Sequence, residues 1–365
     1  MSAHRTITRT ISLRRTLSLL AVVPAVVALA ACGGTSSADS GKSGGAAAEL
    51  RLGYFANVTH APALIGVQDG LFAKELGDTK LTTQVFNAGP DEVEALFGGA
   101  LDAAYIGPSP TINAYGQSDG DAIRIIAGAA SGGAQLVVRD GIDSAADLKG
   151  ATLASPQLGN TQDVALRTWL TDQGLKNSVD GGGDVTIAPT ANSDVLNLFQ
   201  SGQLDGAWVP EPYASRLVLD GGGHVLVDEK DLWPNGEFVT THLIVRTEFL
   251  QQYPDTVAAL LRGHVAAVQE ATDDADKAKT SVNAALEAAG GKALSAAVLD
   301  RAWSELTVTY DPIASALKKS AANGVAAGTT EKKVDLKGIY DLRPLNAVLK
   351  DQSLDPVSAG GLGDE

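Results

Sequence analysis

The sequence predicts an α/β protein of two lobes, each built on a sheet of largely parallel strands. Short apolar segments of strand length alternate with amphipathic segments of helix length through much of the chain. This βαβα order is typical of sheets covered by helices. The alternation is interrupted at Ser131-Gly132-Gly133 and then starts again, and after residue 245 the pattern is helical. Because late helices need a sheet to pack on, we expect the chain to return to the first sheet.

The expected elements follow in order along the chain. The first series consists of strands 50–55, 82–86 and 103–106 and helices 62–75, 91–97 and 110–115. Strand-like residues 125–139, broken at the glycine pair, lead to strands 151–154, 185–188, 206–209 and 225–228 and helices 162–173 and 194–200. Strand-like residues 238–245 then lead to helices 254–272, 275–289, 295–306 and 339–349.

These elements suggest the division into lobes. The first lobe is expected to comprise residues 49–133 plus 239–350, and the second lobe residues 134–238. The two crossovers would form a hinge. Residues 351–365 are expected to be a loose tail.

Composition and charge exclude several classes of protein. A hydrophobic content of 44% is ample for sizeable cores, and a single cysteine excludes a disulfide scaffold. The formal net charge is -15, and the body has no cluster of Lys and Arg. Nucleic-acid binding needs such a cluster to contact phosphates, so we expect no nucleic-acid partner.

The N-terminus has the features of an exported lipoprotein. Several arginines precede the uncharged residues 17–31, a stretch that is short for a membrane-spanning helix. Residues 1–31 therefore predict a signal peptide. Its last residues, Leu29-Ala30-Ala31, stand directly before Cys32 and resemble a bacterial lipobox, which implies a lipid on Cys32. Arg14-Arg15 leaves twin-arginine export open beside the general route.

A flexible tether is expected to follow the anchor. Residues 32–48 are rich in Gly, Ser and Ala, a composition typical of flexible linkers. Together with the signal peptide, this predicts an extracytoplasmic protein that is held at the cell membrane by lipid alone.

Three expected strand-to-helix junctions share one pattern. Residues 57–62, 107–110 and 157–161 each place a small polar residue beside Gly or Pro just before a helix. Helix N-termini carry partial positive charge and free N–H donors, so several of them facing one cleft would bind an anion without an arginine. Ordinary helix capping is the alternative interpretation of each junction.

A family resemblance extends over residues 49–349. Gly53-Tyr54, Ala61-Pro62, the run from Gly70 to Lys74, the run from Ala95 to Pro108, Asp147-Leu148-Lys149-Gly150, Gly159-Asn160-Thr161 and Glu211-Pro212-Tyr213 occur in that order. This series resembles the solute-binding proteins of ABC importers for nitrate, taurine and aliphatic sulfonates. The resemblance implies a type II periplasmic-binding-protein fold, two α/β lobes joined by a two-crossover hinge, that closes on a solute and presents it to a membrane permease.

The resemblance also implies a set of ligand-binding residues. They are Tyr54, His60, Ala61, Pro108, Ser109, Ser131, Gly132, Asn160, Thr161, Trp208, Glu211 and Thr241. Ser109 and Thr161 would donate hydrogen bonds to sulfonate or nitrate oxygens, with helix capping as the alternative. Tyr54 or Trp208 could pack the apolar part of the solute, and core packing is the alternative for Trp208. Glu211 lies between two prolines and would either fix a turn or face an ammonium group such as that of taurine.

Enzyme and metal sites lack a sequence signature. The histidines are scattered without the spacing of a zinc site, and the folded part has no nucleophile elbow. We therefore expect no catalytic residues, no metal and no cofactor, and a monomer whose partners are a small anion and an ABC permease. Relatives that bind thiamine-pyrimidine precursors or other heterocycles, or a related precursor-processing enzyme, remain the alternative.

Overall fold

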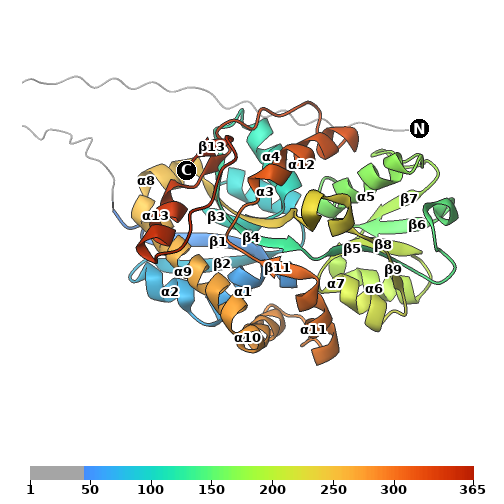
Figure 1. The fold of residues 1–365 in the computed structure, drawn as a ribbon, viewed down its shortest axis with the longest axis horizontal. Helices are drawn as coiled ribbons and strands as arrows, with labels where there is room; N and C mark the ends of the chain where they lie inside the picture. The colour runs from blue at the N-terminus through green and yellow to red at the C-terminus, as the bar shows by residue number, and fades with distance from the viewer. Residues whose placement is uncertain (1–44) are drawn as a thin grey trace, which may run out of the picture. The chain divides into compact units, whose positions relative to one another are not determined.

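Two β-sheets organise the part of the chain that the computed structural model describes, residues 45–365. The predicted signal peptide, Cys32 and the tether as far as residue 44 lie outside the described residues. Figure 1 shows helices packed on both faces of each sheet. No helix among residues 45–365 has the length and apolar character needed to cross a membrane.

The first sheet contains strands from both ends of the described chain. In spatial order its strands are β13 (Gly363–Asp364), β12 (Tyr340–Asp341), β4 (Ile123–Gly132), β10 (Val239–Arg246), β3 (Ala103–Ile106), β1 (Glu49–Phe55) and β2 (Lys80–Phe86), and β11 (Leu306–Val308) pairs with β4. Strand β1 runs parallel to β2 and β3, whereas β10 runs antiparallel to β3 and β4. The returning strand β10 therefore lies inside the first sheet, as the predicted second crossover requires.

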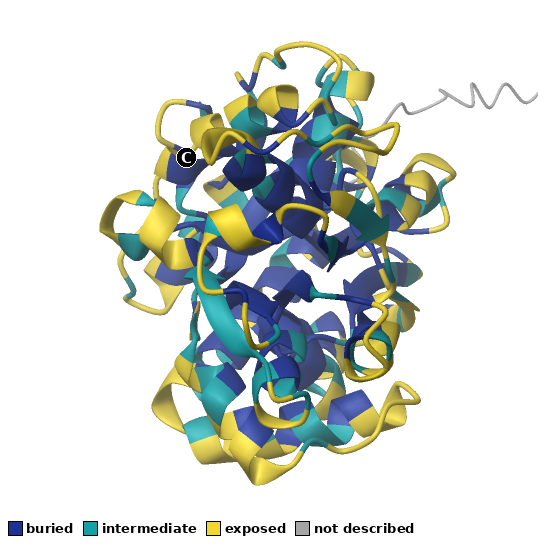
Figure 2. Ribbon diagram, turned by 90° about the vertical axis from the view of Figure 1, so that its right-hand side faces the viewer, coloured by how far each residue is buried: buried dark blue, intermediate teal, exposed yellow. Residues whose placement is uncertain are grey.

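Helices cover both faces of this sheet. They are α1 (Ala61–Gln68), α2 (Leu71–Leu76), α3 (Gly89–Phe97), α4 (Pro108–Gln117), α8 (Thr247–Gln252), α9 (Pro254–Asp273), α10 (Ala275–Ala288), α11 (Ala296–Ser304), α12 (Ala314–Ala326) and α13 (Arg343–Asp351). Helix α9 buries an apolar face that includes Val257, Leu261 and Val268, and it packs on α1 and α2. Figure 2 shows buried residues in the interior and exposed residues on the outer helices and loops. The interior strands β4 and β5 are almost entirely buried, whereas the edge strand β2 is mostly exposed.

The second sheet lies entirely within the residues between the crossovers. Its strands, in spatial order, are β7 (Thr186–Pro189), β6 (Thr152–Ser155), β8 (Gly206–Pro210), β5 (Ala134–Val138) and β9 (His224–Asp228). Successive strand residues point to opposite faces, so Leu136 and Val137 belong to different core clusters. Helix α5 (Thr161–Asp172) covers one face, and α6 (Asn192–Gln200) and α7 (Tyr213–Leu219) cover the other.

The chain crosses between the sheets at Gly133 and at Phe238. Gly132 and Gly133 have φ angles of 78° and 71°, in the left-handed region that favours glycine. Thr240 donates a hydrogen bond to the carbonyl oxygen of Gly132, so the two crossing segments are joined to each other. Two short segments therefore connect the lobes and can form a hinge.

The structure differs from the expected elements at several places. The predicted helix 339–349 begins only at Arg343, because Tyr340 and Asp341 pair in the first sheet as β12. The predicted helix 62–75 is two helices, because Gly70 has a φ of 69° and ends the helical run. Residues 351–365 are not a loose tail: Val357 and Leu362 are buried, and the main chain of Val357 exchanges two hydrogen bonds with Asn346. Helix α12 was not expected from the sequence.

Candidate functional site

A narrow cleft lies between the two lobes. Its lining residues are Phe55, Asn57, Thr59, His60, Gly107 and Thr240 from the first lobe and Asn160, Thr161, Gln162, Asn192 and Pro210 from the second. The free space inside is about 10 Å³, roughly the room that one water needs. The cleft is therefore closed in this structure, and its lining holds neutral polar groups with no Asp, Glu, Lys or Arg.

Four helices begin at this cleft. Gly107 precedes α4, Asn160 precedes α5, Asn192 is the first residue of α6, and His60 precedes α1. None of these four helices has a side chain bonded to its first N–H groups. The helices follow β1, β3, β6 and β7, so they start where ligands bind in open α/β sheets. Free N–H groups come mainly from α5 and α6, because Pro62 in α1 and Pro108 and Pro110 in α4 have none, and the partial positive charge of all four starts favours an anion.

Two polar side chains of the cleft lack hydrogen-bond partners among the described residues. Thr161 Oγ1 and Asn192 Oδ1 are inaccessible to solvent, and the two residues are 7% and 6% exposed. A buried polar atom without a partner costs about 1–3 kcal/mol, so such atoms call for an explanation. Both residues line the cleft, where the Thr161 hydroxyl can donate to a bound solute and the Asn192 carboxamide can do so once its NH2 group is turned into the cleft.

His60 contributes a neutral, fixed ring to the cleft. Its Nε2 lies 3.1 Å from the carbonyl oxygen of Tyr105, which can only accept, so Nε2 carries the hydrogen. The ring stacks on Phe55 with 4.6 Å between centroids. Burial lowers the pKa of His60 to about 3, against the smaller opposing effect of the Tyr105 carbonyl. His60 therefore carries no charge at neutral pH.

Direct contacts between the lobes hold the cleft closed. Asn160 Oδ1 accepts a hydrogen bond of 3.2 Å from the main-chain N–H of Gly89, at the start of α3. Gln157 donates to Asp91 at 2.9 Å. A Cβ added at Gly107 would overlap the Thr161 hydroxyl. The close approach of α4 and α5 thus depends on glycine at this position.

A buried ion pair supports the second lobe's side of the cleft. Asp163 accepts hydrogen bonds from the Ser155 hydroxyl at 2.7 Å, the Gly159 main chain at 3.0 Å and Arg167 Nε at 2.9 Å. The side chains of Asp163 and Arg167 are 0% and 2% exposed. Asp163 thereby fixes both ends of the turn that carries Asn160 into the cleft.

Several predicted ligand-binding residues lie next to lining residues. Ala61 follows His60 at the start of α1, and Pro108 and Ser109 form the first turn of α4 after Gly107. All three residues are buried but do not line the cleft. Their contact with a solute remains a prediction that requires a wider cleft.

In two strands the neighbour of the predicted residue lines the cleft. Phe55 lines it where Tyr54 was expected, and Thr240 lines it where Thr241 was expected. Adjacent strand residues point to opposite faces, so a shift of one position along the strand turns a side chain away from the cleft. Contact of Tyr54 and Thr241 with a solute stays a prediction. Burial raises the pKa of the Tyr54 hydroxyl.

Trp208 and Glu211 have partners outside the cleft. Trp208 is fully buried in the core of the second lobe, where its Nε1 donates to Glu229 at 2.9 Å. The Glu211 carboxylate accepts from the main chain of Ser215 at 3.0 Å and from Arg301 at 2.9 Å. In this structure Trp208 packs in the core, and Glu211 pairs with Arg301 at the junction of the lobes. Contact of either residue with a solute stays a prediction.

Burial raises the pKa of the Glu211 carboxyl to about 7, and its hydrogen bonds and Arg301 act in the opposite direction. Ser131 and Gly132, two further predicted residues, lie at the first crossover and do not line the cleft. Glu211, Ser131 and Gly132 therefore belong to the connection between the lobes.

Several lining residues were not predicted from the sequence. Among them are Asn57, Gln162 and Asn192. Asn192 follows a strand and opens a helix, which is the pattern that identified the other junctions, so the same criterion could have found it. Gln162 directly follows the predicted residue Thr161.

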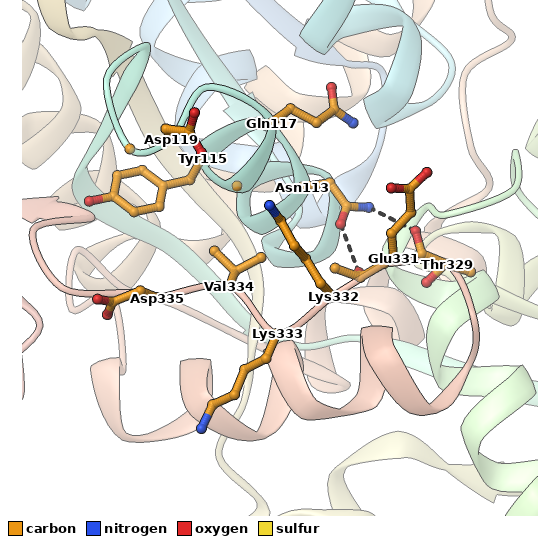
Figure 3. Close-up of a pocket in the computed structure, with 13 residues that line it drawn as sticks. Asn113, Tyr115, Gln117, Asp119, Thr329, Glu331, Lys332, Lys333, Val334 and Asp335 are labelled. Carbon is orange, nitrogen blue, oxygen red and sulfur yellow. Dashed lines mark hydrogen bonds between the residues drawn. The ribbon is translucent and has the colours of Figure 1, made fainter.

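A wider pocket of about 790 Å³ lies on the first lobe, away from this cleft. Figure 3 shows it between the end of α4 and residues 329–335, where Asn113 bonds Thr329 and Thr330. Lys332 and Lys333 are exposed there. The pocket contains no buried polar atom without a partner, so the interlobe cleft is the stronger candidate. Residues 45–365 also contain no group of three potential metal ligands.

Comparison with known proteins identifies relatives along most of the chain. The model of the NMT1-like family matches residues 43–286. A Bacillus subtilis (strain 168) protein named for binding aliphatic sulfonates is 26% identical over 351 residues, covering 94% of this chain and 98% of the relative. The taurine-binding periplasmic protein of Escherichia coli (strain K12) is 29% identical over 211 residues, covering 57% of this chain and 62% of that protein.

A binding protein of Brucella abortus (strain 2308) is 29% identical over 226 residues, or 61% of this chain, and the match spans 66% of that relative's length. Among solved structures, the alkanesulfonate-binding protein of Xanthomonas axonopodis pv. citri bound to MOPS has a TM-score of 0.66 at 22% identity, covering 80% of this chain and 96% of that chain. This likeness confirms the predicted type II periplasmic-binding-protein fold.

Proposed function

The chain belongs to the NMT1-like family, and from this premise we propose that it is the extracytoplasmic solute-binding component of an ABC importer. Its ligand is a small anion, an aliphatic sulfonate, taurine or a nitrate-like ion, which it delivers to a membrane permease. The names of the Bacillus subtilis and Escherichia coli relatives support this ligand class.

One observation carries the proposal: four uncapped helix starts meet neutral polar side chains in a single interlobe cleft. Fixed N–H dipoles stabilise an anion without a counter-charge that would also have to be desolvated. A sulfonate offers three acceptor oxygens to such donors and stays ionised at physiological pH. The Thr161 hydroxyl, which has no partner in the closed cleft, is the donor that we assign to it first.

Calorimetry on Thr161 variants tests this function. Thr161→Val keeps the shape of the side chain and removes the hydroxyl, whereas Thr161→Ser keeps the hydroxyl. A lost hydrogen bond to a charged group is worth about 1.5–3 kcal/mol, so Thr161→Val should bind methanesulfonate or taurine roughly ten- to hundredfold more weakly. Thr171→Val is the matched control, because Thr171 lies on the same helix and bonds the main chain of Arg167 outside the cleft.

Calorimetry on the wild-type protein distinguishes a small-anion ligand from an uncharged heterocycle. Binding of methanesulfonate, taurine or nitrate supports the proposal. Tight binding of an uncharged aminopyrimidine, with no response to any of the three anions, would transfer the assignment to the precursor-binding alternative. Recovery of the solute unchanged after incubation is expected of a binding protein and would be contradicted by a chemical product.

Solute capture is proposed to involve hinged closure at the two crossovers. A solute between α4 and α5 contacts both lobes only when they close around it, in a form wider than the one described here, and this difference in affinity shifts the population toward that form. Small-angle scattering should therefore give a smaller radius of gyration with saturating methanesulfonate. An unchanged radius with a solute that demonstrably binds would place the site within one lobe.

Lipid attachment through Cys32 is proposed for the mature protein, which acts as a monomer. Cys32→Ala should release the protein from the membrane or leave its precursor uncleaved. Partitioning of this variant into the detergent phase at the wild-type level would contradict the anchor.

A further inference from the structure

We propose that Asn192, at the start of α6, binds the oxygens of the solute's anionic head and excludes a second negative charge from this position. The inference rests on the proposed function and adds a residue that neither the sequence motifs nor the relatives assign. It makes the starts of α5 and α6 one subsite, with Thr161 and Asn192 as its two side chains.

The surroundings of Asn192 carry this proposal. Asn192 is 94% buried and lines the cleft, and its Oδ1 has no partner among the described residues. Since no hydrogen bond to a described residue fixes the two ends of the carboxamide, a half-turn of the side chain brings its NH2 group, the donor that an anion requires, to the position of Oδ1. Residue Ala191 precedes it, so no side chain caps the nine-residue helix α6. The first N–H groups of α6 and the carboxamide of Asn192 are therefore both available at the same end of the cleft.

The choice of residue type fits an anion. Aspartate has nearly the same shape as asparagine and would stabilise a helix start through the helix dipole. At the base of a closed cleft, however, its carboxylate would repel a bound anion. Asparagine keeps the shape and the hydrogen-bonding capacity and carries no charge. The partial positive charge at the starts of α5 and α6 also disfavours the ammonium group of a solute such as taurine next to Asn192.

The test compares two Asn→Asp variants of the same helix. Asn192→Asp places the charge in the cleft, whereas Asn197→Asp adds the same charge on an exposed residue of α6. Calorimetry with methanesulfonate and with taurine should show at least about a hundredfold loss of affinity for both solutes in Asn192→Asp and less than about a threefold change in Asn197→Asp. A neutral variant, Asn192→Ser, should lose about tenfold.

The outcomes separate this inference from the proposed function. If the wild type binds neither sulfonate, the proposed function fails. If the wild type binds and Asn192→Asp binds as Asn197→Asp does, the role of Asn192 is refuted. If Asn192→Asp weakens methanesulfonate binding but strengthens taurine binding, the residue faces the amino end, which also overturns the proposal. Thermal unfolding without solute should show that the three variants are folded. If Asn192→Asp is unfolded, the sulfonate affinity of Asn192→Ser tests the role of Asn192 in the same assay, and wild-type affinity in that variant would refute it.

Discussion

A carboxyl group inside the first lobe makes stability depend on pH in a way that can be measured. Glu92, on α3, is fully buried, and neither of its carboxyl oxygens has a hydrogen-bond partner among the described residues. The carboxyl packs directly on Gly53, where an added Cβ would overlap it. Burial raises the pKa of Glu92 well above its ordinary value of 4.5, so the folded protein holds this carboxyl in its protonated form.

The sign and size of the change in unfolding free energy with pH follow from the proton that Glu92 binds in the folded state. The unfolded chain releases it above pH 4.5, whereas the folded chain keeps it, so the folded state loses stability as the pH rises. The loss is at most about 1.4 kcal/mol per pH unit for this one proton, and it continues from pH 4.5 up to the raised pKa of the folded protein. Glu92→Met removes the titrating group and fills a similar volume. Its advantage over the wild type should therefore grow with pH.

Urea unfolding, followed by the fluorescence of the four tryptophans, measures this difference at pH 5, 6 and 7. The expected result is a gap between the unfolding free energies of Glu92→Met and the wild type that widens as the pH rises, by at most about 1.4 kcal/mol per pH unit. Glu94→Met, an exposed position on the same helix, controls for the loss of one acidic side chain. A constant gap over this pH range would show that Glu92 is ionised in the folded protein and would refute the reasoning.

Three further predictions follow from the same structure. Arg167→Met leaves Asp163 as an unpaired buried charge and should lower the free energy of unfolding by about 3–5 kcal/mol, measured in urea; a loss below 1 kcal/mol would contradict the pairing. Gly132→Ala forces a φ of 78° and brings a Cβ to 2.9 Å from a carbonyl oxygen, so its melting temperature should fall more than that of Gly141→Ala, where φ is 87° and the space is open. Because burial lowers the pKa of His60 to about 3, sulfonate affinity should change less than about threefold from pH 5 to pH 8 in calorimetry; a steep loss above pH 6 would indicate a charged histidine.

The fold was largely predictable because its signals are local. The apolar strand segments and the glycines of the first crossover stand out in the sequence, and the structure confirms two α/β lobes. The packing of residues 351–365 was not predictable from the sequence. This segment is largely polar, and its few apolar residues pack on a surface that exists only once the rest of the chain has folded. Helix α12 has many small residues and a weak pattern, and its position depends on α4 and α5, which it contacts.

The candidate site was predictable at the level of loops and less so at the level of side chains. The three polar junctions gave His60, Asn160 and Thr161, which line the cleft. In strands, a shift of one residue reverses the face, so the sequence could not distinguish Thr240 from Thr241. Pairing over long distances, such as that of Glu211 with Arg301, depends on the packing of α11 against α7 and leaves no local signal.

The near absence of free space in the closed cleft has a kinetic consequence. No solute larger than about one water can enter the form described here, so capture has to proceed through open molecules. The association rate should then level off at high solute concentration, at the rate with which the lobes part. The apparent dissociation constant rises as the share of closed, unliganded molecules increases. Contacts at the rim, such as Gln157 with Asp91, therefore tune affinity without touching the solute.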